Sequence, residues 1–113
     1  MTKPIEFPAF LRSLPEADLP FHDAKGWLMQ GPDRQVVFIE FDGDCEVPAH
    51  SHAEQWEIVL AGRVVLRTDD SSTEYRRGDT FFIPAGVEHS ATVHDGYKAI
   101  VIFNSSDRYR AKT

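Results

Sequence analysis

Two histidines separated by one residue are the first feature of this sequence that could do chemistry. His50 and His52 stand in the segment HSHAEQWEIVLAG. In an extended strand, residues two apart point to the same face, with Cα atoms about 6.5 to 7 Å apart. Two imidazoles at that spacing can converge on one metal ion, although two surface histidines would give the same pattern. The pair therefore predicts a metal site only if further ligands join it.

The strand that follows the histidines carries polar side chains on one of its faces. Alternation places Gln55, Glu57 and Val59 together on one face, and Trp56, Ile58 and Leu60 on the other. If Val59 points into a barrel, the Glu57 carboxylate is buried too and needs a hydrogen bond or a cation, which a metal would supply. Alternation alone favours the opposite register, with the three larger apolar side chains in the core and both polar groups in water.

A third histidine follows a turn, a short strand, a proline and a glycine in the segment GDTFFIPAGVEH. Proline ends a strand, and glycine lets the chain bend before His89. His89 begins a new strand in which Ala91 and Val93 share its face. These small, apolar neighbours predict that His89 points inward. The two remaining histidines, His22 and His94, are expected to be ordinary polar residues.

The elements that must position these residues are predicted to be β-strands. From Gly26 to Phe103, β-branched and aromatic runs alternate with turn residues every 8 to 12 residues or so, which is typical of a sandwich or barrel. The expected strands are Trp27–Gln30, Gln35–Phe41, Glu46–Ala49, Gln55–Leu60, Arg63–Thr68, Thr73–Arg76, Thr80–Ile83, Ser90–Val93 and Lys98–Phe103.

The two ends of the chain differ from this central segment. Residues 1–25 carry four prolines and many apolar side chains, so we expect an extended arm with one helical turn near Pro8 to Leu14. Such an arm would pack along its own domain or onto a neighbouring subunit, which predicts a homodimer. Residues 26–106 are expected to form the barrel. Residues 107–113 are basic and polar, and are expected to be a frayed or surface tail.

Composition limits the class of protein. The chain has 113 residues, of which 42% are hydrophobic, and this suits one domain. A net charge of -6 argues against a nucleic-acid partner, and the sequence lacks an apolar run long enough for a signal or a membrane span, so a cytoplasmic protein is expected. The single cysteine, Cys45, has no intrachain partner. Residues 46, 48, 50 and 52 share one face of an extended strand. We therefore expect Cys45 to be a packed thiol on the opposite face, away from the metal.

Two linked segments resemble the conserved motifs of the cupin superfamily. Gly43 to Gly62 resembles the first motif, a glycine, His-x-His, an acidic or amide ligand and a closing glycine; Gly78 to His89 resembles the second. Together they span about half of the chain in the order typical of the family. The chain is thus identified as a member of this superfamily, similar to small single-domain, RmlC-like bacterial cupins. The resemblance implies an all-β fold, a double-stranded β-helix or jelly-roll barrel, preceded here by the N-terminal arm.

The resemblance also implies a ligand set. His50, His52 and His89 match the three metal histidines of the family, and the face that carries Gln55 and Glu57 is directed into the barrel. Counting forward from His52 makes Glu57 the fourth ligand, whereas counting back seven residues from the closing glycine makes it Gln55. We favour Gln55, because strand register is fixed more rigidly than loop length. Glu57 is then an unligated acid or base beside the substrate.

Such a site suits one divalent transition metal, with Fe, Mn, Ni, Co and Zn all compatible with the ligands. Open positions on the ion would let it act on a bound molecule. We expect a small metal-dependent enzyme, dioxygenase-, isomerase- or cyclase-like, that acts on a small molecule held in the barrel. The alternative is a non-catalytic cupin module that binds a small ligand or senses a metal. Trp27, Met29, Phe82 and Tyr97 could reach the pocket, or could equally be core or surface residues.

Overall fold

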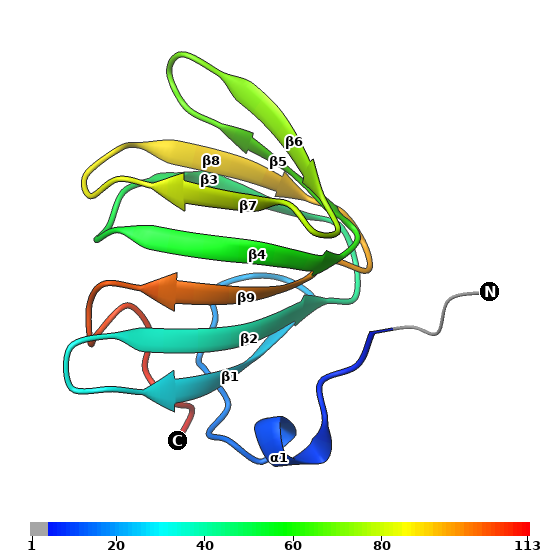
Figure 1. Cartoon of the computed structure of the whole chain (residues 1–113), viewed down its shortest axis with the longest axis vertical. Helices are drawn as coiled ribbons and strands as arrows, with labels where there is room; N and C mark the ends of the chain where they lie inside the picture. The colour runs from blue at the N-terminus through cyan, green and yellow to red at the C-terminus, as the bar shows by residue number, and fades with distance from the viewer. Residues whose placement is uncertain (1–4) are drawn as a thin grey trace.

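The computed structural model describes residues 5–113, which contain nine strands and one short helix (Figure 1). The elements are α1 (Ala9–Arg12), β1 (Ala24–Gln30), β2 (Gln35–Phe41), β3 (Cys45–His50), β4 (Gln55–Ala61), β5 (Arg63–Arg67), β6 (Ser72–Arg76), β7 (Thr80–Ile83), β8 (His89–Val93) and β9 (Lys98–Phe103). All nine predicted strands are present. Within the described residues, no helix is long and apolar enough to cross a membrane.

The strands form two antiparallel sheets with the topology of a jelly roll. One sheet has the order β1-β2-β9-β4-β7 and the other has the order β3-β8-β5-β6. The last strand, β9, lies between β2 and β4, and β8 lies between β3 and β5 (Figure 1). The predicted all-β jelly-roll fold is therefore confirmed. This order matters for the site, because it places the two histidine-bearing segments on neighbouring strands.

The main core lies between the sheets and is built by alternation along each strand. Val37 and Ile39 of β2 and Ala99 and Val101 of β9 are all buried, each 6% exposed or less. Burying a valine or isoleucine side chain contributes about 1.5 to 3 kcal/mol, so the inward-facing rows hold the sheets together. One end of this interior is polar, and it contains the histidines.

A second apolar cluster lies on the outer face of the five-stranded sheet. The Phe7 ring packs edge-on against Trp27 and Phe38, with centroids 6.1 and 5.8 Å away. Leu11 and Leu14 pack against the same cluster. The described part of the arm therefore packs along its own domain, the first of the two predicted places; residues 1–4 lie outside the described range.

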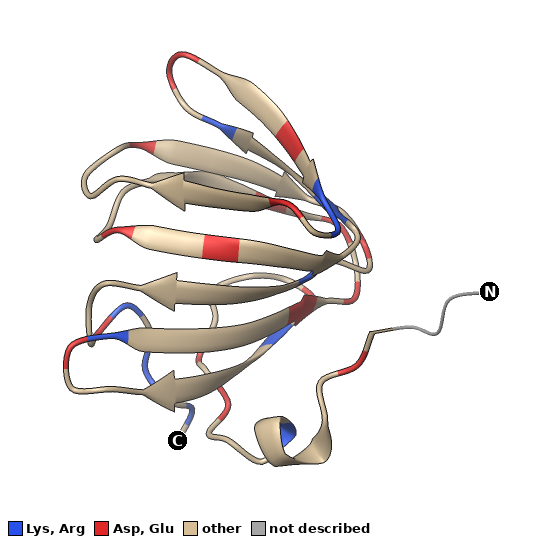
Figure 2. Ribbon diagram, in the orientation of Figure 1, with Lys and Arg blue, Asp and Glu red and all other residues tan. Residues whose placement is uncertain are grey.

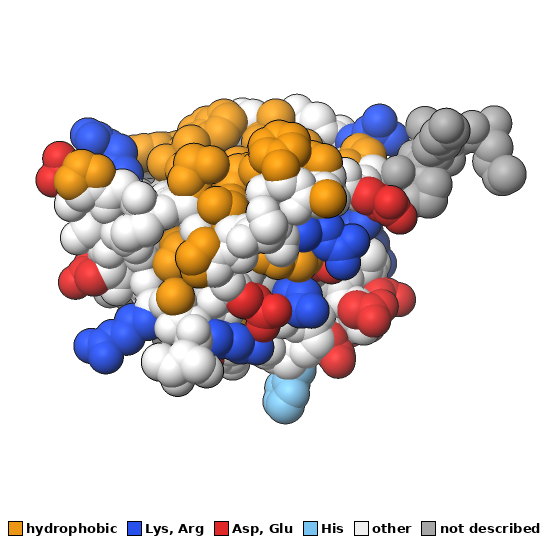
Figure 3. All heavy atoms as spheres, turned by 90° about the horizontal axis from the view of Figure 1, so that it is seen from below, with side chains coloured by type: hydrophobic (Ala, Val, Ile, Leu, Met, Phe, Trp, Pro, Cys, Tyr) orange, Lys and Arg blue, Asp and Glu red, His pale blue; other side chains and the backbone are white. Residues whose placement is uncertain are grey.

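The remainder of this outer face is apolar and exposed. Met29, Trp56 and Phe82 are 44%, 39% and 55% exposed. Apolar side chains gather along one side of the molecule in the space-filling view (Figure 3). Most of the charged residues lie instead in turns and near strand ends (Figure 2). The five-stranded sheet thus has two apolar faces, of which one is only partly covered.

The C-terminal segment was predicted to be a frayed or surface tail. Most of its side chains are exposed, but one buried residue holds the segment against the barrel. Tyr109 is buried, and its main chain is held by the Gln35 side chain, which donates to the Tyr109 carbonyl at 2.7 Å and accepts from the Tyr109 amide at 3.0 Å. Ala111 forms a β-bridge with Ala17 of the arm. The prediction rested on the polar composition of the segment and gave too little weight to one large aromatic side chain that the barrel end can bury.

Candidate metal centre

Pairing between β3 and β8 brings the first and third histidines together. His50 is the register partner of His89, and the register shifts between Val47 and His50. The shift breaks the alternation of β3, because the extra residue turns the chain. Cys45 and Val47 are buried on the inner side, and His50 also lines the cavity. The parity argument that Cys45 faces away is therefore wrong, whereas its prediction as a packed thiol is confirmed.

His52 lies in the loop between β3 and β4, and a backbone hydrogen bond ties it to the second motif. The Gly86 amide donates to the His52 carbonyl at 3.0 Å. Gly86 has φ +78°, a conformation that glycine adopts without strain. This bend returns the chain toward His52 just before β8 begins at His89. The two motifs therefore form one structural unit.

The three histidines form a cluster that could hold a metal ion. One ligand atom from each of His50, His52 and His89 lies within 4.8 Å of the others. Nitrogens bound at about 2 Å to one tetrahedral ion stand roughly 3.3 Å apart, so small ring rotations would bring all three onto one ion. In the described residues, neither His22 nor His94 belongs to this cluster, as expected.

Backbone hydrogen bonds fix which nitrogen of each ring is left for an ion. Nδ1 of His50 lies 2.8 Å from the Pro48 carbonyl, Nδ1 of His52 lies 2.7 Å from that of Ala53, and Nδ1 of His89 lies 2.9 Å from that of Val87. A carbonyl oxygen only accepts, so each Nδ1 must carry the hydrogen and each Nε2 must have a free lone pair. The donor set therefore fits a divalent transition metal.

The surroundings also favour the neutral form of two of these rings, as metal binding requires. Burial lowers the pKa of His52 to about 4, and the charges of Arg108 and the neighbouring histidines act in the same direction. Burial likewise lowers the pKa of His89. Protons therefore compete weakly with a metal at these two rings near neutral pH.

Strand β4 turns its polar face into the barrel. Glu57 and Val59 are buried and Gln55 lines the cavity, whereas Trp56 is exposed. The inward register implied by the cupin resemblance is confirmed, and the register that alternation alone favours is wrong. Alternation failed here because the outer face of β4 is apolar as well, and Leu60 packs against the outer cluster.

A buried hydrogen-bonded chain links Gln55, Glu57 and Tyr97. The Gln55 amide nitrogen donates to Glu57 Oε1 at 2.7 Å, and the Tyr97 hydroxyl donates to Glu57 Oε2. Burial raises the pKa of Glu57 to about 7, against the opposing effect of these two hydrogen bonds. Burial and the nearby carboxyl group raise the pKa of Tyr97, so its hydroxyl stays protonated and remains a donor.

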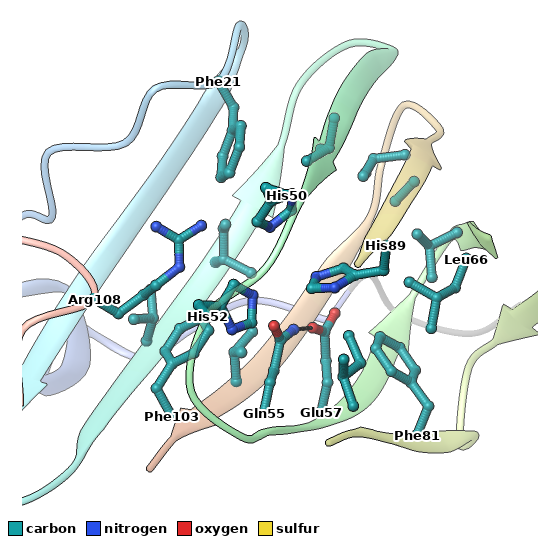
Figure 4. Close-up of a pocket in the computed structure, with 18 of the residues that line it drawn as sticks. Phe21, His50, His52, Gln55, Glu57, Leu66, Phe81, His89, Phe103 and Arg108 are labelled. Carbon is teal, nitrogen blue, oxygen red and sulfur yellow. Dashed lines mark hydrogen bonds between the residues drawn. The ribbon is translucent and has the colours of Figure 1, made fainter. Parts of the chain in front are cut away.

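Gln55 and Glu57 extend from β4 toward the three histidines, as Figure 4 shows. They line a cavity of about 80 Å³ whose other walls are mostly apolar. Phe21, Tyr97, Arg108 and Tyr109 also line it. Four side chains were expected from the sequence to be able to reach the pocket, and Tyr97 does so. Of the other three, Trp27 lies in the outer cluster, and Met29 and Phe82 are exposed.

Sequence reasoning missed the contribution of the C-terminal segment. Tyr97 was not missed, since it was among the four residues expected to be able to reach the pocket, and it is buried like Ala99 and Val101, two and four residues further along the chain. Arg108 lies outside every predicted strand, so alternation could not place its side chain. The neighbouring Tyr109 was the one sign in the sequence that part of this segment is buried.

Comparisons with known proteins agree with this fold. The family model described as "Cupin domain" matches residues 37–103, more than half of the chain. An RmlC-like cupin from Shewanella frigidimarina is 25% identical, with a TM-score of 0.72, over 95% of this chain and 94% of that chain. KdgF from a Halomonas species is 19% identical, with a TM-score of 0.68, over 81% and 88% of the two chains. No curated protein sequence matches the chain.

Proposed function

The chain belongs to the cupin domain family, and from that premise we propose that it binds one divalent transition metal through His50, His52 and His89. The observation that carries the proposal is the set of three Nδ1 hydrogen bonds to backbone carbonyls, which leaves three Nε2 atoms for one ion. Fixing a ring through its second nitrogen is the usual way in which proteins orient metal-binding histidines.

Gln55 is the fourth ligand in this proposal. Its amide nitrogen donates to Glu57, which leaves the amide oxygen as the group that can face the ion. Both oxygens of Glu57 already accept a hydrogen bond, one from Gln55 and one from Tyr97. A carboxylate occupied in this way is the weaker candidate ligand, so the hydrogen-bond pattern supports Gln55.

Glu57 is then the group that moves a proton. A pKa near 7 is well suited to general acid or base catalysis, because both protonation states are present at neutral pH. Tyr97 holds one carboxyl oxygen and Gln55 holds the other, so the group is oriented as well as buried. When bound, the metal would act as a Lewis acid on the same small molecule.

The resulting function is that of a small metal-dependent enzyme, with dioxygenase-, isomerase- or cyclase-like chemistry on a molecule held in the barrel. The cavity supports a small molecule rather than a polymer, since its volume is about 80 Å³ and side chains from both sheets line it. The second candidate is a module that binds a small ligand or senses a metal without turnover. It uses the same histidines but gives Glu57 no chemical role.

Two substitutions on β4 test the division of labour. We expect Gln55→Ala to weaken metal binding at least tenfold and Glu57→Gln to retain the metal but abolish turnover. Glu88→Gln is the matched control, since Glu88 precedes His89 but is exposed. Metal affinity is measured by competition with a chelator. If Glu57→Gln strips the metal and Gln55→Ala does not, the two roles are reversed.

Turnover separates the two candidate functions. Metal-loaded protein is incubated with a mixture of small organic molecules, and the mixture is followed by mass spectrometry. A product that forms with the wild type but not with Glu57→Gln supports an enzyme. A ligand that is retained unchanged and shifts the metal affinity tenfold or more supports the sensing module.

A further inference from the structure

Arg108 stands at the mouth of the metal cavity and is not explained by metal binding. It lines the cavity and also the neighbouring surface cleft, and the two spaces share Phe21, Val47 and His50 as well. Figure 4 shows the guanidinium group between Phe21 and His52, on the side of the histidines opposite to Glu57. A molecule entering the barrel by this cleft meets Arg108 and His50 before it reaches His52 and His89.

Aromatic rings hold the guanidinium group in place. Its central carbon lies 4.5 Å from the centroid of the Tyr109 ring and 5.8 Å from that of Phe103. Phe103 in turn contacts the His52 ring edge-on, with centroids 5.5 Å apart. Stacking on aromatic faces is a mode of contact that suits arginine. Phe103 thus contacts both the guanidinium group of Arg108 and the His52 ring of the histidine cluster.

This fixed cation has no anionic partner among residues 5–113. Its Nε atom is buried without a hydrogen-bond partner, and none of the ion pairs found in that range includes it. By contrast, Arg63 and Arg76 each pair with Glu74. A buried donor without an acceptor costs free energy, which a ligand that offers an acceptor would recover.

The charge balance of the cavity indicates what that ligand is. Arg108 is the only arginine or lysine among the described lining residues, and Glu57 is the only acidic residue. A divalent ion at the histidines would leave the cavity with an excess of positive charge. The two parallel N–H groups of one guanidinium match the two oxygens of one carboxylate, whereas a doubly charged phosphate would call for more cationic partners.

We propose that Arg108 binds the carboxylate group of a small organic acid, whose other end reaches the metal held by His50, His52 and His89. This inference rests on the proposed function, because it places the ligand between the guanidinium group and the ion. It assigns the C-terminal segment a role in substrate selection. The apolar walls between the two ends would contact the hydrocarbon part of the acid.

Matched acid and amide pairs test this assignment on the zinc-loaded full chain. Pyruvate with pyruvamide, and benzoate with benzamide, are titrated while binding is followed by protein NMR. We expect the wild type to prefer the acid over the amide at least tenfold in one pair. Arg108→Met, which keeps the long apolar stem, should lose that preference. Arg110→Met is the control, since Arg110 is exposed in the same segment, and it should keep the preference within about twofold.

The outcomes separate the two proposals. Zinc uptake is measured in the same samples, and Arg108→Met should bind zinc as the wild type does. A wild type that takes up none of Zn(II), Ni(II) and Fe(II) overturns the proposed function. A zinc-loaded wild type that shows no preference for the acids, or an Arg108→Met variant that keeps the preference, overturns the role of Arg108 alone. If Arg108→Met fails to fold, Arg108→Lys takes its place. Lysine keeps the charge but not the two-pronged donor, so an unchanged preference would contradict bidentate carboxylate binding.

Discussion

At the scale of single residues, the site depends on groups that hold one another in a fixed orientation. Each histidine of the cluster is held through Nδ1 by a carbonyl from a residue one or two positions away in the chain. The sequence did not predict these hydrogen bonds. It predicted the three histidines as ligands through the resemblance of the two motifs to the cupin family, because the His-x-His spacing alone fits two surface histidines as well. Arg108 reaches the site from a distant segment that has no strand period, and no local pattern in the sequence predicts that contact.

The buried carboxyl of Glu57 makes the stability of the metal-free protein depend on pH. Its pKa in the folded protein is raised to about 7 from an ordinary value of 4.5. The folded state therefore holds the proton more tightly, and this stabilisation is present below pH 4.5 and is lost as the pH rises through 7. The loss amounts to about 3 kcal/mol at most, at 1.36 kcal/mol for each pKa unit.

This prediction is checked by urea unfolding of the metal-free wild type and Glu57→Gln at pH 4.5 and pH 8. Comparing the two cancels the opposite contribution of His52, whose lowered pKa destabilises the folded state on acidification. We expect the wild type to lose about 2 to 3 kcal/mol relative to the variant between the two pH values. Glu88→Gln should show the pH dependence of the wild type. Parallel pH curves for the wild type and Glu57→Gln would contradict a raised pKa.

At the scale of elements, the strands could be predicted and their irregularities could not. Alternation and turn residues located all nine strands, since both signals are local. The register shift in β3 carries no such signal, and it reversed the predicted direction of Cys45. The register of β4 depended on the family resemblance, because the apolar outer face of this strand made alternation alone favour the wrong register.

The closing glycine of the first motif, Gly62, lets the chain turn after β4 and pack closely against the Tyr97 backbone. Gly62 has φ +73°, and a Cβ added there would stand 2.8 Å from the backbone nitrogen and Cα of Tyr97. Alanine would therefore be strained and would also push Tyr97 away from Glu57. Gly78 has φ +91° with no atom within 4 Å of such a Cβ, so it is the matched control.

We expect Gly78→Ala to cost about 1 to 2 kcal/mol of stability, from backbone strain alone. Gly62→Ala should cost more than that, because the clash with the Tyr97 backbone adds to the strain. Denaturant unfolding measures both variants. Equal losses in the two proteins would mean that close packing against Tyr97 is not what requires a glycine at position 62.

At the scale of the whole molecule, the apolar outer face of the five-stranded sheet is the feature that still needs a partner. The arm covers Trp27 and Phe38, but Met29, Trp56 and Phe82 remain exposed. Large exposed apolar patches on a protein usually mark an interaction surface. The sequence predicted a homodimer from the arm, and we propose that this sheet face, rather than the arm, is where a second copy packs. A second copy would bring the same exposed apolar side chains against it.

Light scattering tests the dimer. The wild type should run at twice the chain mass, and the double variant Trp56→Lys, Phe82→Lys should run as a monomer, because lysines would be buried at the interface without partners. Thr73→Lys is the control, since it adds a lysine at an exposed position on the other sheet. A monomeric wild type contradicts the dimer. A dimer that survives both lysines contradicts this face as its interface.

The metal content of the purified protein tests the central claim most directly. Elemental analysis of untagged protein, after exposure to Ni(II), Fe(II) or Zn(II) and dialysis, should find about one ion per chain. The double variant His50→Ala, His89→Ala removes the paired ligands of β3 and β8 and should retain less than a tenth of that amount. A wild type that stays metal-free with all three ions, or a double variant that binds as much metal as the wild type, would contradict a metal centre at these histidines.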